Sequence, residues 1–131
     1  MDLGRVKLIL NVDSIGGIAV GLLVFLLHDV LVWLYDLPLT TVLLLGAANL
    51  GYGLFSGSLA LFARMRDAAP PRPLLLLLVT ANCLWPLVCV GLIVSHWPAS
   101  SWLGVVSVAL EGIYVGALGI VEARIFRFFR A

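Results

Sequence analysis

Apolar residues in this chain come in four long runs that are separated by short polar clusters. A helix of about 20 apolar residues is long enough to cross a bilayer. The runs therefore predict four membrane-spanning helices, at roughly residues 6–27, 39–63, 74–94 and 102–126. Because the connecting loops are short, we expect an all-α membrane protein in which residues 1–131 form one up-down-up-down four-helix domain.

The first apolar run continues beyond His28 as far as Tyr35, which makes it too long for one span. An unbroken helix from Arg5 to Tyr35 would be about 46 Å long, whereas the hydrocarbon core is about 30 Å thick. We therefore expect either a bend near His28 or a short interfacial segment anchored by Trp33 and Tyr35.

Composition supports the membrane interpretation. The chain is 63% hydrophobic and 11% charged, against about 45–50% and about 25% in soluble domains. The expected partner is therefore the lipid bilayer. A net charge of +1 lacks the basic footprint of nucleic-acid binding. Cys83 and Cys89 are six residues apart on one predicted helix, so they point to opposite sides and are expected to be buried thiols rather than a disulfide.

Basic residues mark one end of every predicted span. They lie before the first span, between the second and third, and after the fourth: Arg5, Lys7, Arg64, Arg66, Arg72, Arg124, Arg127 and Arg130. The positive-inside rule then places both termini in the cytoplasm, most simply at a bacterial inner membrane. Trp33, Trp97 and Trp102 fall at the opposite ends and are expected to form an outer aromatic belt.

Each span also carries strongly polar groups. Glu111 falls near the bilayer centre, where an ionisable group costs at least ~2.5 kcal/mol and is expected to face protein or water. Aromatic residues follow three of the polar ones by three positions, on the same helix face. The predicted intramembrane polar layer comprises Asp13, Asn49, Tyr52, Asn82, Trp85, Glu111 and Tyr114. Glu122, eleven residues after Glu111, shares its helix face but is not placed in this layer.

Two roles for this layer are open. It could form a binding pocket or an ion or proton path, or it could hold the helices together, since interhelical hydrogen bonds of this kind contribute about 0.6–2 kcal/mol. The packing role is favoured for the asparagines. The functional role is favoured for Asp13 and Glu111, because a buried carboxyl is a poor choice for packing alone.

Glycines spaced four residues apart predict close helix contacts. The pairs are Gly17 and Gly21, Gly53 and Gly57, and Gly112 and Gly116. Such pairs let two backbones approach, either inside the chain or between copies in a homo-oligomer. Asn49, Tyr52 and Gly57 also recur 62 positions later as Glu111, Tyr114 and Gly119, which is either a weak parallel repeat or chance similarity.

His28 and His96 end two predicted spans on the outer side. They could ligate a b-type haem, or a metal together with Asp29, or they could be ordinary interfacial residues. Three functions remain open. The favoured one is a homo-oligomeric protein that binds or transports a small molecule or ion. The others are an accessory or structural subunit of a larger membrane complex, and a membrane enzyme or haem-carrying electron carrier. No sequence motif identifies a known family.

Overall fold

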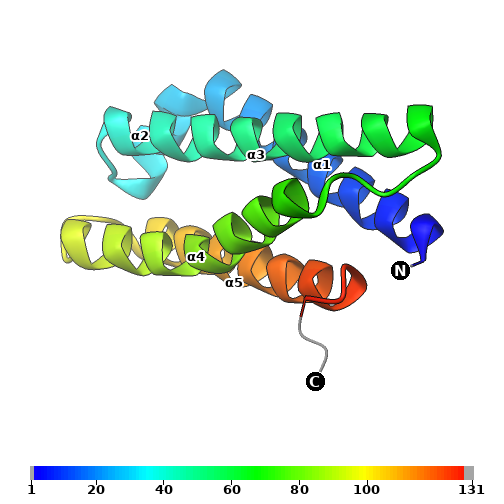
Figure 1. The fold of residues 1–131 in the computed structure, drawn as a ribbon. Coiled ribbons are helices and arrows are strands. Elements are labelled where there is room, and N and C mark those ends of the chain that lie inside the picture. The colour runs from blue at the N-terminus through cyan, green and yellow to red at the C-terminus, as the bar shows by residue number, and fades with distance from the viewer. Residues whose placement is uncertain (1, 129–131) are drawn as a thin grey trace.

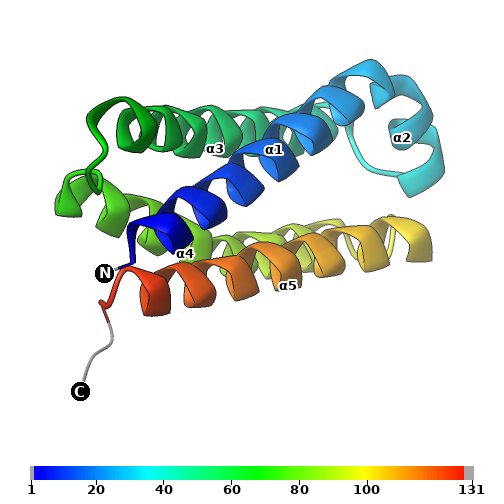
Figure 2. The ribbon, with the colours of Figure 1, turned by 90° about the vertical axis from the view of Figure 1, so that its right-hand side faces the viewer.

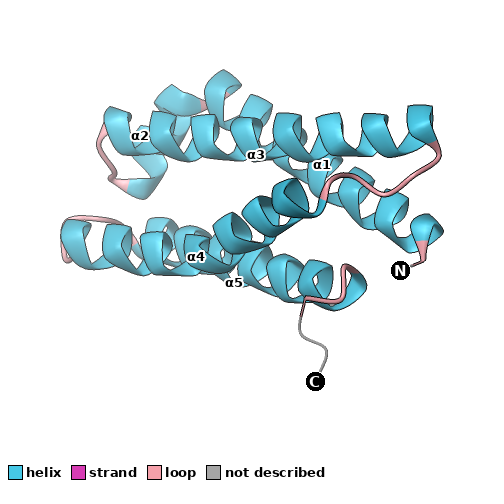
Figure 3. Ribbon diagram, viewed as in Figure 1, coloured by secondary structure: helices cyan, strands magenta, loops and turns pink. Residues whose placement is uncertain are grey.

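A computed structural model describes residues 2–128, which form five α-helices and no strand (Figure 3). The helices are α1 (Leu3–Leu26), α2 (His28–Tyr35), α3 (Leu39–Arg66), α4 (Arg72–His96) and α5 (Trp102–Ile125). The all-helical prediction is confirmed. All except α2 are long and apolar enough to cross a membrane.

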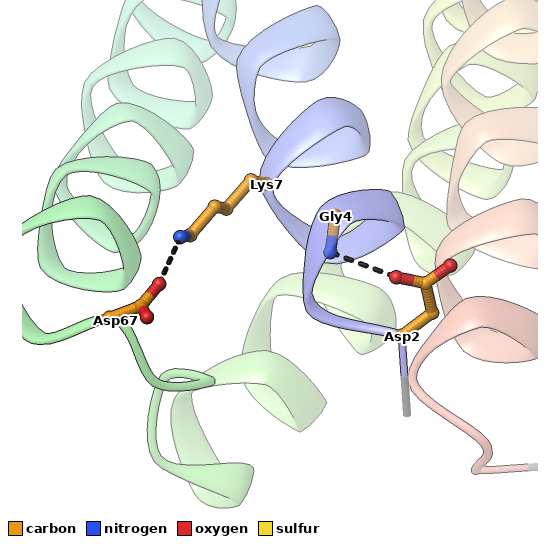
Figure 4. Close-up of polar contacts among 4 residues, drawn as sticks. All are labelled: Asp2, Gly4, Lys7 and Asp67. Atoms are coloured by element: carbon orange, nitrogen blue, oxygen red, sulfur yellow. Dashed lines mark hydrogen bonds and ion pairs between the residues drawn. The ribbon is translucent and has the colours of Figure 1, made fainter.

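The helix boundaries extend beyond several of the predicted ones because the prediction counted apolar residues and ignored polar caps. Asp2 caps α1 by accepting the Gly4 amide hydrogen at 2.9 Å (Figure 4). Ser101 caps α5 in the same way through the Gly104 amide, at 3.1 Å. The α3 helix continues through its basic last turn to a left-handed C-cap at Asp67, with φ of 46°.

The predicted interruption near His28 is confirmed. Leu27 leaves the helical conformation, with φ of −108° and ψ of 16°, and separates α1 from α2. The short α2 then ends at Asp36, whose φ of 50° is a left-handed conformation that aspartate tolerates better than most residues. That α2 lies at a membrane interface remains a prediction.

The long helices are arranged as two packed pairs (Figures 1 and 2). The α1 helix packs mainly against α3, and α4 packs mainly against α5, while the two pairs meet each other less extensively. Figure 2 shows α1 and α3 above α5 and α4. Within α4, Pro86 removes one helical hydrogen bond near the middle, which is a usual cause of a bend.

Predicted glycine contacts form the interior of both pairs. A Cβ added at Gly53 of α3 would lie 2.5 Å from the Ile18 amide nitrogen of α1, and one at Gly17 would lie 2.7 Å from the Asn49 carbonyl oxygen. In the other pair, a Cβ at Gly116 would lie 2.6 Å from Pro86 Cγ. These glycines are therefore used within the chain.

Contacts between segments far apart in the sequence define the two ends of the molecule. At one end, Lys7 Nζ pairs with Asp67 Oδ1 at 2.7 Å (Figure 4), so the start of α1 meets the α3–α4 loop. At the other end, Ser101 Oγ donates to the Leu34 carbonyl oxygen at 2.8 Å. The start of α1 and the end of α5 both lie at the first of these ends (Figure 1). Seven of the eight basic residues are described, whereas Arg130 lies outside residues 2–128.

The outward surface is largely apolar. Leu26, Leu87 and Ile113 are 79%, 68% and 67% exposed, and many other large apolar side chains are exposed between them. Trp33, Trp97 and Trp102 are also exposed. The prediction that these three tryptophans form a belt at a membrane surface stays open. Soluble monomers rarely expose so extensive an apolar surface, which instead is typical of helices that face lipid.

Candidate functional site

The predicted polar layer separates into two clusters between the helix pairs. In the first cluster, Asn49 of α3 donates from Nδ2 to Glu111 Oε1 of α5 at 2.6 Å. Trp85 of α4 donates from Nε1 to the same oxygen at 3.2 Å. Asn49 also bonds back to the Leu45 carbonyl oxygen at 2.9 Å, which fixes its side chain. Glu111 therefore joins three helices from both pairs.

Two tyrosines border this cluster in different ways. Tyr52 packs edge-on against Trp85, with 5.7 Å between ring centroids, and so supports the indole that holds Glu111. Tyr114 was expected to share the cluster, but its side chain is 49% exposed and makes no hydrogen bond to Glu111. Its hydroxyl lies against Gly16 of α1 instead, 3.1 Å from where a Cβ would stand.

A cavity of about 330 Å³ lies beside the first cluster. Its polar lining comprises Tyr35, Asn49, Ser107, Glu111 and Tyr114, and its apolar lining includes Val20, Val24, Leu45 and Leu110. Both protein donors reach Oε1 of Glu111, and no hydrogen bond from the described residues reaches Oε2. The arrangement leaves one carboxyl oxygen for a ligand in a mostly apolar cavity.

The second cluster joins all four long helices. Asn82 Nδ2 of α4 donates to Glu122 Oε2 of α5 at 2.9 Å. Asp13 of α1 lies beside Asn82, Glu122 and Ser56 of α3. All four side chains are buried. Glu111 and Glu122 are eleven positions apart, which is about 16 Å along a helix. The structure brings Asp13 and Asn82 together with Glu122 rather than with Glu111.

Glu122 is the residue that the sequence-based set lacked. Its position two residues before Arg124 favours a place at the membrane interface, yet its side chain is 0% exposed. The signal that could have found it was its spacing from Glu111, which places both carboxyls on one face of α5. Ser56 was also missed, because serine is common in helix contacts and its position alone indicates no chemistry.

The ion pairs in the described part of the chain all lie near helix ends. They join Arg5 to Asp2, Lys7 to Asp67 and, when the imidazole is protonated, His28 to Asp29. The hydrogen bond and the positive charge of Lys7 hold the pKa of Asp67 below its ordinary value. No ion pair among residues 2–128 reaches Asp13, Glu111 or Glu122.

The histidines have separate neighbours. The two ring nitrogens of His28 face the Phe25 carbonyl oxygen, at 2.7 Å, and Asp29, at 3.3 Å. Those of His96 face the Leu92 carbonyl oxygen, at 2.8 Å, and the Thr41 hydroxyl, at 3.2 Å. Over residues 2–128, no three His, Cys, Asp or Glu side chains converge as a metal-binding group, so His28, Asp29 and His96 are not gathered into one site.

No protein-family model, curated protein or solved structure matches this chain. A fold alone does not determine a function, which depends instead on sites such as the two clusters and the cavity.

Proposed function

We propose that this chain is an integral membrane protein that binds a small organic cation in the cavity beside Glu111 and transports it across a bacterial inner membrane. The observation that carries the proposal is a carboxyl group in the wall of an apolar cavity, inside a chain with four helices of membrane-spanning length. Pockets of about 300 Å³ or more with a few polar groups are typical of small-molecule sites.

The chemistry of the cavity favours a cationic ligand with an apolar body. Glu111 has no cationic partner among the described residues, and a ligand would supply the missing charge. Tyr35 and Tyr114 line the same cavity and offer aromatic faces, each of which stabilises a cation by about 0.5–2 kcal/mol. Val24 and Leu45 provide apolar surface for the remainder of the ligand.

Transport is supported by the position of the polar contacts. Asn49 of α3 bonds to Glu111 of α5 across the two helix pairs, and Asp13 of α1 faces Asn82 and Glu122, where contact between the pairs is least extensive. Many transporters work by rocking one packed bundle against another around a central site. Here each pair would move as a unit, and Glu111 would exchange its contacts with Asn49 for contacts with ligand.

Binding is tested with phenyltrimethylammonium on the purified full-length protein, by calorimetry and by quenching of tryptophan fluorescence. We expect Glu111→Gln to weaken binding at least about tenfold through loss of the charge, while the exposed control Asp36→Asn binds normally. tert-Butylbenzene, which has the same shape without charge, should bind weakly to the wild type. If a folded Glu111→Gln protein binds the cation like wild type, the proposed function is wrong.

A second candidate is a non-catalytic accessory subunit of a larger membrane complex, in which the polar groups only hold helices together. The two hydrogen bonds that converge on Glu111 Oε1 favour this candidate. It predicts that Glu111→Gln lowers stability without changing any binding. The fluorescence titration and a thermal melt of the same variant therefore separate the two candidates.

The proposed topology is an up-down-up-down bundle with both termini in the cytoplasm, supported by the basic residues at one end of the long helices. Ala68 and Ala99 are exposed in the loops at opposite ends. A membrane-impermeant thiol reagent added to whole cells should label Ala99→Cys and leave Ala68→Cys unlabelled. The reverse result would show that the chain is inverted.

We also propose a homo-oligomer. The glycine pairs that could have served contacts between copies are occupied within the chain, so they no longer support it. Cross-linking of the full-length protein in native membranes tests this point. Bands at multiples of the monomer mass are expected, and a monomer at every cross-linker concentration would contradict it.

A further inference from the structure

The start of α1 lies beside the end of α5 (Figure 2), and three arginines line a pocket there. The pocket has a volume of about 260 Å³, and its lining comprises Asp2, Arg5, Arg124, Ile125 and Arg127. Three guanidinium groups and one carboxylate give these residues a net charge of +2. A concave site with this excess of positive charge attracts anions.

The protein core beneath the pocket holds the three arginines near one another. Each of them is the chain neighbour of a buried apolar residue: Val6, Ala123 and Phe126 belong to one core cluster and are at most 3% exposed. Packing of α1 against the end of α5 therefore fixes the backbone positions from which the three side chains extend. The arginines are brought together by the fold and not by a flexible tail.

The carboxylate in the pocket does not neutralise all three arginines. Asp2 Oδ1 accepts the Gly4 amide hydrogen at 2.9 Å, and Asp2 Oδ2 lies 3.4 Å from Arg5 Nε. Asp2 thus serves the first turn of α1 and one guanidinium group. Within residues 2–128, no ion pair reaches Arg124 or Arg127. Like charges that line one pocket repel each other, and an anion bound between them would offset that repulsion.

Arg127 occupies a backbone position that favours glycine. The Phe128 amide donates to the Ala123 carbonyl oxygen at 2.9 Å, and the Arg127 amide donates to the Arg124 carbonyl oxygen at 3.2 Å. These two bonds form the Schellman motif that ends many helices, and Arg127 has the left-handed φ of 62° at the position where glycine is commonest. A side chain in this conformation is strained, yet here it forms part of the pocket wall.

We propose that Arg5, Arg124 and Arg127 bind the phosphate group of an anionic phospholipid. Guanidinium groups form paired hydrogen bonds with phosphate oxygens, and basic pockets between membrane helices bind anionic lipid headgroups. A headgroup with a net negative charge offsets the charge of the lining, whereas a zwitterionic headgroup brings an ammonium group that the arginines repel. The site requires that the long helices span a membrane, and it is separate from the proposed cation cavity.

The apolar surface beside the pocket favours a lipid over a free phosphate ion. Leu8 and Val12 follow Arg5 by three and seven positions, and Val121 precedes Arg124 by three, so these residues share the helix faces of the arginines. All three apolar side chains are exposed. They extend from the pocket toward the middle of the two helices, where the acyl chains of a lipid held by its phosphate would lie.

The test uses the full-length protein in a neutral detergent at constant ionic strength, with phosphatidylglycerol or phosphatidylethanolamine added. We expect phosphatidylglycerol alone to raise the melting temperature by several degrees, since a ligand that binds only the folded state stabilises it. Native mass spectrometry should show the same lipid retained on the protein. Inorganic phosphate at the lipid concentration should have no effect. Equal melting temperatures in the two lipids would overturn the proposal, and an equal shift with inorganic phosphate would show a free-phosphate site instead of a lipid site.

Substitutions assign the response to the pocket. Arg124→Gln and Arg127→Gln should each weaken phosphatidylglycerol binding about fivefold, which is the contribution of one basic residue at an anionic membrane surface. Arg66→Gln is the matched control, because Arg66 is an exposed arginine outside the pocket. If both folded variants bind phosphatidylglycerol like wild type, or if Arg66→Gln loses as much affinity, the assignment to this pocket is wrong.

Arg127→Gly separates binding from a structural role. Glycine adopts the left-handed conformation without strain, so the lipid-free variant should melt at a higher temperature than wild type, while phosphatidylglycerol binds about fivefold more weakly. An unchanged lipid affinity would overturn the role of Arg127, whatever the melting temperature. The comparison of lipids on the wild type decides the proposal if a variant fails to fold, and its result does not depend on whether phenyltrimethylammonium binds.

Discussion

The contacts within the α1–α3 pair and the contacts between the two helix pairs differ in their main chemistry. Within the α1–α3 pair, backbones approach so closely that Gly17 and Gly53 leave no room for a Cβ. Between the pairs, the connections include the side-chain hydrogen bond from Asn49 of α3 to Glu111 of α5, whereas the bond from Asn82 to Glu122 lies within the α4–α5 pair. Close packing of two backbones fits in only one arrangement, whereas a side chain can exchange one hydrogen-bond partner for another.

This difference suggests which parts can move. Close packing is lost steeply with small displacements, because dispersion contacts fade within about 1 Å. Interhelical hydrogen bonds in membranes average only about 0.6 kcal/mol, and a ligand can replace them. We therefore expect each pair to be rigid and the interface between the pairs to be adjustable. Function, on this view, belongs to the weaker of the two interfaces.

The largest effect is expected inside a pair. Gly53→Ala would place a Cβ 2.5 Å from the Ile18 backbone nitrogen, so the helices must separate, and we expect about 1–3 kcal/mol of destabilisation. Gly51, two residues away on α3, has open space around a Cβ. Gly51→Ala should be neutral or stabilise by up to about 1 kcal/mol, because alanine favours helix. Thermal melts in one detergent compare the two variants.

Equal melting temperatures for Gly51→Ala and Gly53→Ala would contradict the close packing of α1 on α3. A second comparison uses the other pair. Gly116→Ala would bring a Cβ 2.6 Å from Pro86 Cγ, a side-chain atom, whereas Gly91→Ala on α4 meets nothing within 4 Å. The cost at Gly116 should be smaller than at Gly53, because a proline ring can shift more readily than a backbone nitrogen.

An intermediate effect is expected between the pairs. Asn49→Ala removes the 2.6 Å hydrogen bond to Glu111. Among the described residues, Trp85 is then the remaining donor to the Glu111 carboxyl. We expect a loss of about 0.6–2 kcal/mol, which is below that of Gly53→Ala. Ser58→Ala is the control, because Ser58 is exposed and bonds only within its own helix. If Asn49→Ala costs more than Gly53→Ala, the ranking of the two interfaces is wrong.

A smaller effect separates two properties of Tyr52. Its hydroxyl lies 3.5 Å from the Ala81 carbonyl oxygen, which is long for an O–H donor, so Tyr52→Phe should leave stability nearly unchanged. Its ring meets Trp85 edge-on, and the loss of such a pair costs about 0.5–1.5 kcal/mol beyond buried area. Tyr52→Leu should therefore destabilise and weaken cation binding through Trp85. Equal losses of stability in Tyr52→Phe and Tyr52→Leu would contradict this role for the ring.

The sequence predicted the helices better than their grouping. Run length and the break near His28 follow from local chemistry, since an apolar run has few alternatives to a long helix. The glycine spacing indicated close contacts but not the partner helix. The sequence does not indicate that Gly53 packs against Ile18 of α1 rather than against a residue of α4. The polar layer divided for the same reason, because Asp13 and Glu111 lie on helices whose relative height depends on packing.

The smallest effect is expected at the surface. Lys7 and Asp67 join the start of α1 to the end of α3 (Figure 4), yet the Asp67 side chain is 85% exposed. Exposed ion pairs contribute little to stability. Asp67→Asn is a clean test of the charge, because asparagine tolerates the left-handed φ of 46° at this C-cap. We expect almost no change in the melting temperature at pH 7. The change should be smaller again in high salt, because salt screens the two charges.

The pH dependence of this pair has a definite sign. Because Lys7 lowers the pKa of Asp67 below its ordinary value of 3.8, the folded state holds the ionised carboxylate more strongly than the unfolded state does. The contribution is therefore present above the unfolded pKa and is lost as pH falls through the folded one. Wild type and Asp67→Asn should thus converge in acid. If the difference in melting temperature between wild type and Asp67→Asn grows as pH falls below 4, Asp67 stabilises the loop by its shape rather than its charge.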